Sequence, residues 1–228
     1  MSEAMIEAIS WLSVAATMAI LALYEFRFAI RARRPTERVA RQAHETLREE
    51  WFAAISTTPG TEVLAVQTLR NSLMSASVTA STAVLGLVGA VTLSAPLLRE
   101  SFILGGMPMF TPRLALELVL LVLLLSSLIS SAMAVRYYTH AGFIGAMPVG
   151  SESRLRWTAT GGLYVRRAGV LYGRGLRNLI LLSPVLTGIV YPFAGPVAAI
   201  LVVRGLQRFD RLSKQTRSVH HPETLYMP

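Results

Sequence analysis

The feature that most constrains this chain is a series of long apolar runs that contain almost no charged residues. Three of them cover residues 11–30, 72–98 and 114–135. A helix that crosses the hydrocarbon core of a bilayer needs about 20 consecutive apolar residues, because lipid offers no partner to unpaired backbone groups. Each run reaches that length, and 53% of the 228 residues are hydrophobic. The sequence therefore predicts an all-α fold, a polytopic bundle of transmembrane helices.

A fourth apolar run, from residue 179 to residue 208, is interrupted at its centre by Pro192, Gly195 and Pro196. Proline and glycine break a helix, so the run is either one kinked span or a hairpin of two arms, about 179–191 and 194–208. Each arm is shorter than a full span, which favours a re-entrant hairpin whose turn is shielded by protein. We expect four transmembrane helices, or five spans when both arms are counted.

The distribution of arginine favours the hairpin. Short cytoplasmic loops of membrane proteins carry an excess of Lys and Arg. The loops after the first and third spans are rich in arginine, and so is the start of the tail, whereas the loop at 97–113 holds two arginines. This pattern predicts a bacterial inner (plasma) membrane protein with its N-terminus outside and its basic, flexible tail, 213–228, in the cytoplasm. The arginines of the cytoplasmic loops then account for the net charge of +9. The expected partners are the lipid bilayer and its anionic headgroups, with no nucleic acid.

A charged but periodic segment, 36–55, separates the first two spans. Its apolar residues recur every four positions and would share one face of an amphipathic helix, as Val39, Ala43, Leu47, Trp51 and Ile55 do. Pro59-Gly60 ends this helix, and Thr61 can cap a new one that runs directly into the second span. A second surface helix is expected in the arginine-rich stretch 154–177.

Small and weakly polar residues fall on one face of the second span, namely Ser72, Ser75, Thr79, Thr82, Gly86 and Gly89. Such a face either packs closely against another helix or lines a pore. Glu117 lies near the start of the third span, where a carboxylate at a helix N-terminus is expected to stay solvated.

Polar residues cluster near the predicted cytoplasmic ends of the spans, and we expect them at one level: Gln67, Arg70, Asn71, Arg136, Tyr137, His140, Arg174 and Arg177. They are either interfacial anchors that bond loop backbone and lipid phosphate, or an electropositive vestibule that concentrates a small anion before a pore.

Four stretches resemble a known family. They are LAVQTLRNSLM at 64–74 followed by ASTA at 80–83, VRYYTHAGF at 135–143, YGRGLR at 172–177 and FAGP at 193–196. Together they cover most of the chain from Trp51 to about Asp210, and they are similar to domain of unknown function 599 (DUF599), an uncharacterised membrane family of bacteria and plants. The resemblance implies an all-helical membrane protein and no established activity.

The chain shows no recognisable catalytic set. It lacks a nucleophile elbow, a phosphate-binding glycine loop and an HExxH motif, its four histidines have no metal-ligand spacing, and it has no cysteine. We therefore expect no enzyme, no metal and no cofactor. Two functions are favoured: a homo-oligomeric channel or transporter for a small ion or solute, and a non-catalytic accessory or scaffold subunit of a larger membrane complex. An enzyme that acts on lipid is the third and weakest alternative.

Overall fold

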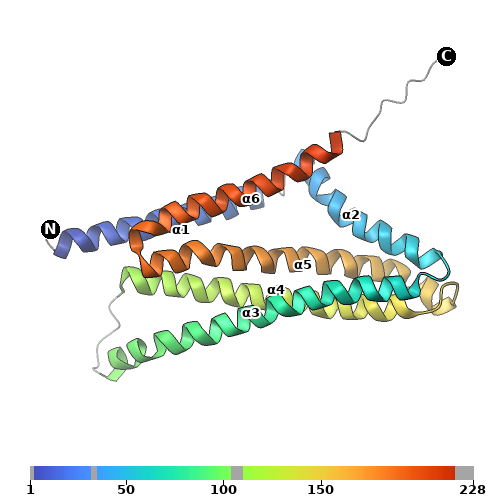
Figure 1. Cartoon of the computed structure of the whole chain (residues 1–228), viewed down its shortest axis with the longest axis horizontal. Coiled ribbons are helices and arrows are strands. Elements are labelled where there is room, and N and C mark those ends of the chain that lie inside the picture. The colour runs from blue at the N-terminus through green and yellow to red at the C-terminus, as the bar shows by residue number, and fades with distance from the viewer. Residues whose placement is uncertain (1–2, 32–34, 104–109, 219–228) are drawn as a thin grey trace, which may run out of the picture.

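The computed structural model describes residues 3–31, 35–103 and 110–218, and all regular structure within these residues is helical. The elements are α1 (Glu3–Arg31), α2 (Pro35–Thr57), α3 (Glu62–Ile103), α4 (Pro112–Ala146), α5 (Glu152–Val190), a short 3-10 helix η1 (Pro192–Ala194) and α6 (Gly195–Ser218) (Figure 1). The all-helical fold is confirmed. Of the predicted flexible tail, residues 213–218 belong to α6, and residues 219–228 lie outside the described residues.

Three helices are long and apolar enough to cross a membrane, in α1 over Met5–Ile30, in α3 over Glu62–Thr92 and in α4 over Pro112–Ala146. They contain all or most of the three predicted spans, and their composition is that of a membrane protein. The predicted fourth and fifth spans are not confirmed by length and composition. The arginines of α5 and the basic end of α6 lower the hydropathy of both helices.

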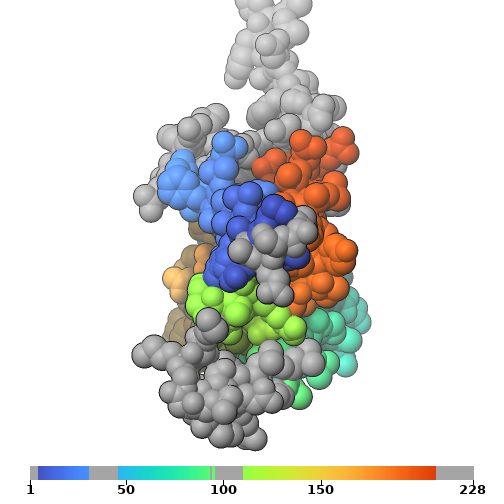
Figure 2. All heavy atoms as spheres, turned by 90° about the vertical axis from the view of Figure 1, so that its left-hand side faces the viewer, coloured from blue at the N-terminus to red at the C-terminus, as the bar shows by residue number. Residues whose placement is uncertain are grey.

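Helices α3, α4 and α5 lie side by side, and α4 packs extensively against both neighbours. Helices α1 and α6 run together along the other side of α5 and diverge from it (Figure 1). Viewed from the end where α1 begins, α1 (blue) lies between α6 (orange) and the start of α4 (light green) (Figure 2). We call this end, with the α5–α6 turn, the hairpin end. The opposite end, with the α2–α3 and α4–α5 turns, is the tip.

Helix α5 is continuous over 39 residues, so the predicted surface helix at 154–177 and the run from 179 form one element. Asn178, just before the predicted arm, is buried within the helix and donates a hydrogen bond to Ser126 of α4. Helix α3 begins at Glu62, after the turn at Gly60, whose φ of 82° suits glycine. It continues to Ile103, so the loop expected from residue 97 begins later, and residues 104–109 lie outside the described residues.

The last apolar run doubles back as the proline and glycine pattern predicts. Tyr191 is extended, Pro192–Ala194 forms the 3-10 turn, and α6 starts at Gly195. The turn is tight, because a methyl group on Gly195 would lie 3.2 Å from the Cα of Gly188 in α5. The run is therefore a hairpin, with Pro192, Gly195 and Pro196 at its turn.

The buried apolar side chains form two clusters along the bundle. One lies toward the hairpin end and includes Leu21, Leu116 and Leu181. The other lies toward the tip and includes Phe52 and Tyr138, where α2 folds back onto α5. Between them, α4 and α5 meet through polar side chains.

Candidate functional site

A fully buried arginine fastens the α4–α5 turn at the tip. The Nη1 atom of Arg154 donates hydrogen bonds to the backbone oxygens of Ile144 and Met147, the latter at 3.2 Å, and its guanidinium lies 5.6 Å from the centre of the Phe52 ring. The Glu62 carboxylate at the start of α3 accepts a hydrogen bond of 3.1 Å from the backbone N–H of Val149. The α4–α5 turn is thus fastened both to its own helices and to α3.

The electrostatics of this contact indicate a structural cation. Burial lowers the pKa of Arg154 from its ordinary value, and the negative charge of Glu62 partly opposes this shift. The Nε and Nη2 atoms of Arg154 have no hydrogen-bond partner among the described residues. A guanidinium has so high an intrinsic pKa that it stays charged at neutral pH, so Arg154 positions backbone and exchanges no proton.

Arg154→Met should lower the free energy of unfolding by about 2–3 kcal/mol, because two buried carbonyls lose a charged donor. For a chain of this size the melting temperature should fall by about 5–10 °C. Tryptophan fluorescence of the detergent-solubilised protein measures the change. Arg156→Met is the control, since Arg156 forms only an exposed ion pair with Glu152 and its loss should shift melting by less than about 2 °C. Equal melting of the two variants would contradict the structural role of Arg154.

A polar seam joins α4 to α5 between the two apolar clusters. The Ser127 hydroxyl donates a 2.8 Å hydrogen bond to the backbone oxygen of Gly175, and the Asn178 amide donates one of 2.8 Å to Ser126 Oγ. A methyl group on Gly175 would lie 2.4 Å from Ser131 Oγ, so Ser131 packs directly on the backbone of α5. The serines of the third predicted span therefore allow α4 and α5 to pack closely at the polar seam.

Arg177 extends the seam to α1. Its guanidinium carbon lies 3.4 Å from the centre of the Phe28 ring, a cation–π contact between α5 and the end of α1. Because Gly175 meets Ser127, Arg177 lies at the level of the serine-rich part of α4, on the side of α5 that faces α1.

The eight residues of the expected vestibule fall at two levels. Tyr137 and His140 both pack against Tyr164 of α5, with ring centres 5.5 and 5.9 Å apart. Arg174 is ten residues farther along α5 than Tyr164, a distance of about 15 Å along the helix axis. Arg177, beside Phe28, lies farther still.

The α3 members of that set are exposed, namely Gln67, Arg70 and Asn71, as are Arg136 and His140 on α4. Among the described residues, no hydrogen bond or ion pair joins these two groups. The tip half thus presents two sets of polar side chains on neighbouring helices, while Arg174 and Arg177 lie closer to the hairpin end.

The small-residue face of α3 is divided between the bundle and the outside. Thr79 is buried, Gly86 lies against Leu124 of α4, and Ser72 hydrogen-bonds with the Tyr138 hydroxyl. Ser75, Thr82 and Gly89 are exposed. Half of the face therefore packs within the chain, and the other half points away from it.

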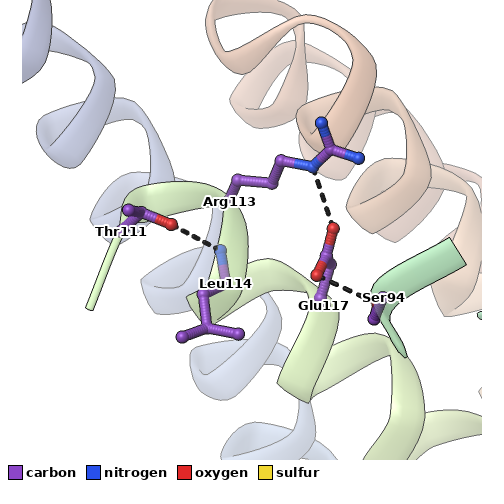
Figure 3. A network of polar contacts seen from close by, with 5 residues as sticks. All are labelled: Ser94, Thr111, Arg113, Leu114 and Glu117. Carbon is purple, nitrogen blue, oxygen red and sulfur yellow. Dashed lines mark hydrogen bonds and ion pairs between the residues drawn. The ribbon is translucent and has the colours of Figure 1, made fainter. Parts of the chain in front are cut away.

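Glu117 takes part in a contact between α3 and α4 near the hairpin end (Figure 3). Its carboxylate accepts hydrogen bonds from Ser94 Oγ at 3.1 Å and from Arg113 Nε at 2.9 Å. Thr111 caps α4 by accepting from the Leu114 N–H. We expected a solvated carboxylate, but the Glu117 residue is only 9% exposed, because Ser94 of α3 covers it.

A family model described as "Protein of unknown function, DUF599" matches residues 12–215. The chain belongs to the DUF599 family. The match extends from α1 into α6 and so includes both the tip contacts and the polar seam of this DUF599 protein. No curated protein and no solved structure matches the chain.

Two features of this DUF599 protein are absent from the expectations drawn from its sequence. One is the buried Arg154, which the sequence places in an arginine-rich surface stretch. The other is a row of α5 glycines under α2: methyl groups on Gly161 and Gly169 would lie 2.3 Å from Phe52 and 2.0 Å from Arg48. The spacing of these glycines was the available signal, because small residues about two turns apart allow close helix approach.

Within the described residues, no group of three His, Asp or Glu side chains is placed to hold a metal ion.

Proposed function

We propose that this DUF599 protein is a homo-oligomeric channel or transporter for a small ion or solute, with the outward face of α3 lining the path between copies. The observation that carries the proposal is a row of exposed small residues that recurs every seven positions along α3: Thr68, Ser75, Thr82 and Gly89. The same face also exposes Asn71, Val78 and Leu85.

A spacing of seven keeps these residues on one side of a helix that supercoils with a partner. Small side chains let helices approach, and the Ser75 and Thr82 hydroxyls donate to the carbonyls of Asn71 and Val78. A hydroxyl satisfied in this way still presents a weakly polar surface to a passing solute. Arg70 lies exposed at the tip end of the same helix and would draw anions toward the path. The arginine bias supports a cytoplasmic tip in the bacterial inner membrane.

Thr82→Leu should reduce flux at least tenfold, because it fills the small-residue row with a branched apolar side chain. Chloride and potassium flux into reconstituted vesicles measures the effect. Val84→Leu is the matched control on the same helix, since Val84 is exposed outside the row, and its flux should stay within twofold of the wild type. Arg70→Ala should lower chloride flux more than potassium flux. A monomer in mass photometry, or equal flux in Thr82→Leu and Val84→Leu, would refute the proposal.

A non-catalytic scaffold subunit is the second candidate. The exposed face of α5 between the tip and the polar seam alternates arginines with aliphatic residues, as in Arg156, Leu163, Arg167, Val170 and Arg174. A face of this composition suits an acidic, partly apolar protein partner. Vesicles that show no flux with the wild-type protein would favour this function over the channel.

A further inference from the structure

Close contacts at the hairpin end fix the relative levels of three helices. A methyl group on Gly195 at the start of α6 would lie 2.7 Å from Thr17 Oγ1 of α1 and 3.2 Å from Gly188 of α5. Residues 17, 188 and 195 therefore lie at one level. From there α1 and α6 run toward the tip in increasing residue number, whereas α5 runs toward it in decreasing number (Figure 1).

Each helix rises 1.5 Å per residue, and arginines recur in a band about 8 Å deep that lies about nine to fourteen residues from this point. Counting ten residues gives Arg27 on α1, position 205 on α6 and position 178 on α5. The contact of Arg177 with Phe28 agrees with this count independently. We call this set the arginine belt, and it consists of Arg27, Arg174, Arg177, Arg204 and Arg208.

Aromatic residues gather at the hairpin end. Trp11 stacks on Phe110 with ring centres 5.5 Å apart, and Tyr191 and Phe193 are exposed at the turn. The sixteen residue steps from Trp11 to Arg27 span about 24 Å. Exposed side chains between the two levels include Leu12, Leu23, Leu186, Val197 and Leu201. Aromatic residues at one level, arginines at the other and aliphatic residues between them are the pattern of a bilayer crossing, with snorkelling arginines adding to its thickness.

The arginine belt lies at a different level from the membrane surface that hydropathy predicts for α3 and α4. Their predicted spans end near Arg70 and Arg136, and Arg136 lies nine residues, about 13 Å, beyond Ser127 at the belt. A membrane surface at Arg136 would draw the belt into hydrocarbon. Burying several charges costs more than exposing residues 127–135 and the facing part of α3, 72–83, to water. Serine, threonine and alanine make up most of these two segments, and of the large apolar side chains only Met74, Val78 and Ile129 are exposed. This comparison favours a bilayer surface at the belt over one at Arg136.

We propose that the arginine belt binds the phosphate groups of anionic phospholipids at one membrane surface, and that α3, α4 and α5 project beyond it into water. Arg27, Arg174, Arg204 and Arg208 are exposed, and among the described residues none of them forms an ion pair. Guanidinium groups bind phosphate oxygens in a bidentate manner, which suits a row of lipid headgroups. This inference does not depend on the channel proposal. Gly86 meets Leu124, so Thr82 lies near the level of the belt; Gly89 would line the part of the path inside the bilayer, and Thr68 and Ser75 the part of the path beyond its surface.

Native mass spectrometry of the full chain tests the binding, with phosphatidylglycerol and phosphatidylcholine as probes. The wild type should retain at least fivefold more phosphatidylglycerol than phosphatidylcholine. The belt variant carries Arg27→Gln, Arg174→Gln, Arg204→Gln and Arg208→Gln, and it should lose that preference. A control of equal charge carries Arg70→Gln, Arg136→Gln, Arg156→Gln and Arg167→Gln, and it should keep it. Equal loss in both variants, or no preference in the wild type, would overturn the proposal.

Competition with inorganic phosphate distinguishes binding of lipid headgroups from binding of free phosphate, because both present the same phosphate oxygens to the belt. If the belt is a headgroup site, millimolar phosphate should displace less than half of the bound phosphatidylglycerol. Complete displacement would assign the belt to free phosphate and reject the lipid assignment.

Single-cysteine labelling in oriented membranes tests where the membrane surface lies along the helices. The method is applicable because the chain has no cysteine of its own. Ala132→Cys and Val78→Cys lie beyond the belt on exposed positions and should react with a membrane-impermeant maleimide as fast as Thr139→Cys. Leu118→Cys lies between the two levels and should react at least tenfold more slowly. Slow labelling of Ala132→Cys and Val78→Cys would place the membrane surface at Arg136 and overturn the proposal.

Discussion

Gly175→Val should separate α4 from α5 and cost about 3 kcal/mol or more in the free energy of unfolding. A Cβ atom at residue 175 would lie 2.4 Å from Ser131 Oγ and 3.3 Å from the backbone oxygen of Ser127. The oxygen of Ser127 belongs to a helix and cannot move alone. The substitution would therefore also break the hydrogen bond from Ser127 to Gly175, which joins the two helices at the polar seam.

Gly173→Val is the matched control for this prediction. It makes the same exchange two residues away on the same helix, where a Cβ atom would meet nothing within 4 Å. Its intrinsic effect on helix stability is small and similar in both variants. Thermal unfolding in detergent should show a fall of about 10 °C for Gly175→Val and less than about 2 °C for Gly173→Val. Similar melting of both variants would mean that α4 and α5 do not approach closely at Gly175.

Gly161→Val should detach α2 from α5. A Cβ atom there would lie 2.3 Å from the ring of Phe52, which is completely buried. We expect a loss of about 3 kcal/mol, comparable to that of Phe52→Ala, which leaves a cavity instead of a clash. The double variant should be more stable than the sum of the two losses implies, by about 1–2 kcal/mol, because the smaller residue at 52 makes room for valine.

Limited trypsin digestion measures the detachment directly. Cleavage within α2, 35–57, should accelerate at least tenfold in Gly161→Val and less so in the double variant. Gly142→Val serves as the control, since a Cβ atom at Gly142 would meet nothing within 4 Å. Unchanged cleavage in Gly161→Val would contradict the packing of α2 on α5.

The features that the sequence predicts well are local ones. The turn before Glu62 follows from Pro59-Gly60, and the hairpin follows from Pro192, Gly195 and Pro196, because these residues restrict the backbone wherever they occur. The helical class follows from the length of the apolar runs, since lipid excludes irregular backbone.

The features that the sequence did not predict depend on which helix faces come together. The apolar repeat of 36–55 pointed to Leu47, Trp51 and Ile55 as the packing face. Ile55 is buried and Trp51 packs against the same cluster, but Leu47 is 59% exposed and Phe52 is completely buried. The buried face of α2 is the one that packs on Gly161 and Gly169 of α5, which lie more than a hundred residues away in the sequence. The side chains of Val39 and Ala43 lie outside the described residues.

The same reason explains the candidate site. Residues at the ends of predicted spans were expected at one level, but the register between neighbouring helices is set by contacts such as Ser127 with Gly175 and Tyr164 with His140. Arg154 carries no sequence signal of burial, because its partners are backbone oxygens, which any residue supplies.

The fastening of the tip has a mechanical consequence. Glu62 and Val149 tie the start of α3 to the α4–α5 turn, and α5 runs from that turn for 39 residues without a break. At 1.5 Å per residue, α5 is a rod of about 58 Å, so a tilt of about 5° about its tip end displaces its hairpin end by about 5 Å. A force that tilted α5, together with the α4 helix packed along it, would therefore displace Tyr191 and the α5–α6 turn at the far end of the molecule.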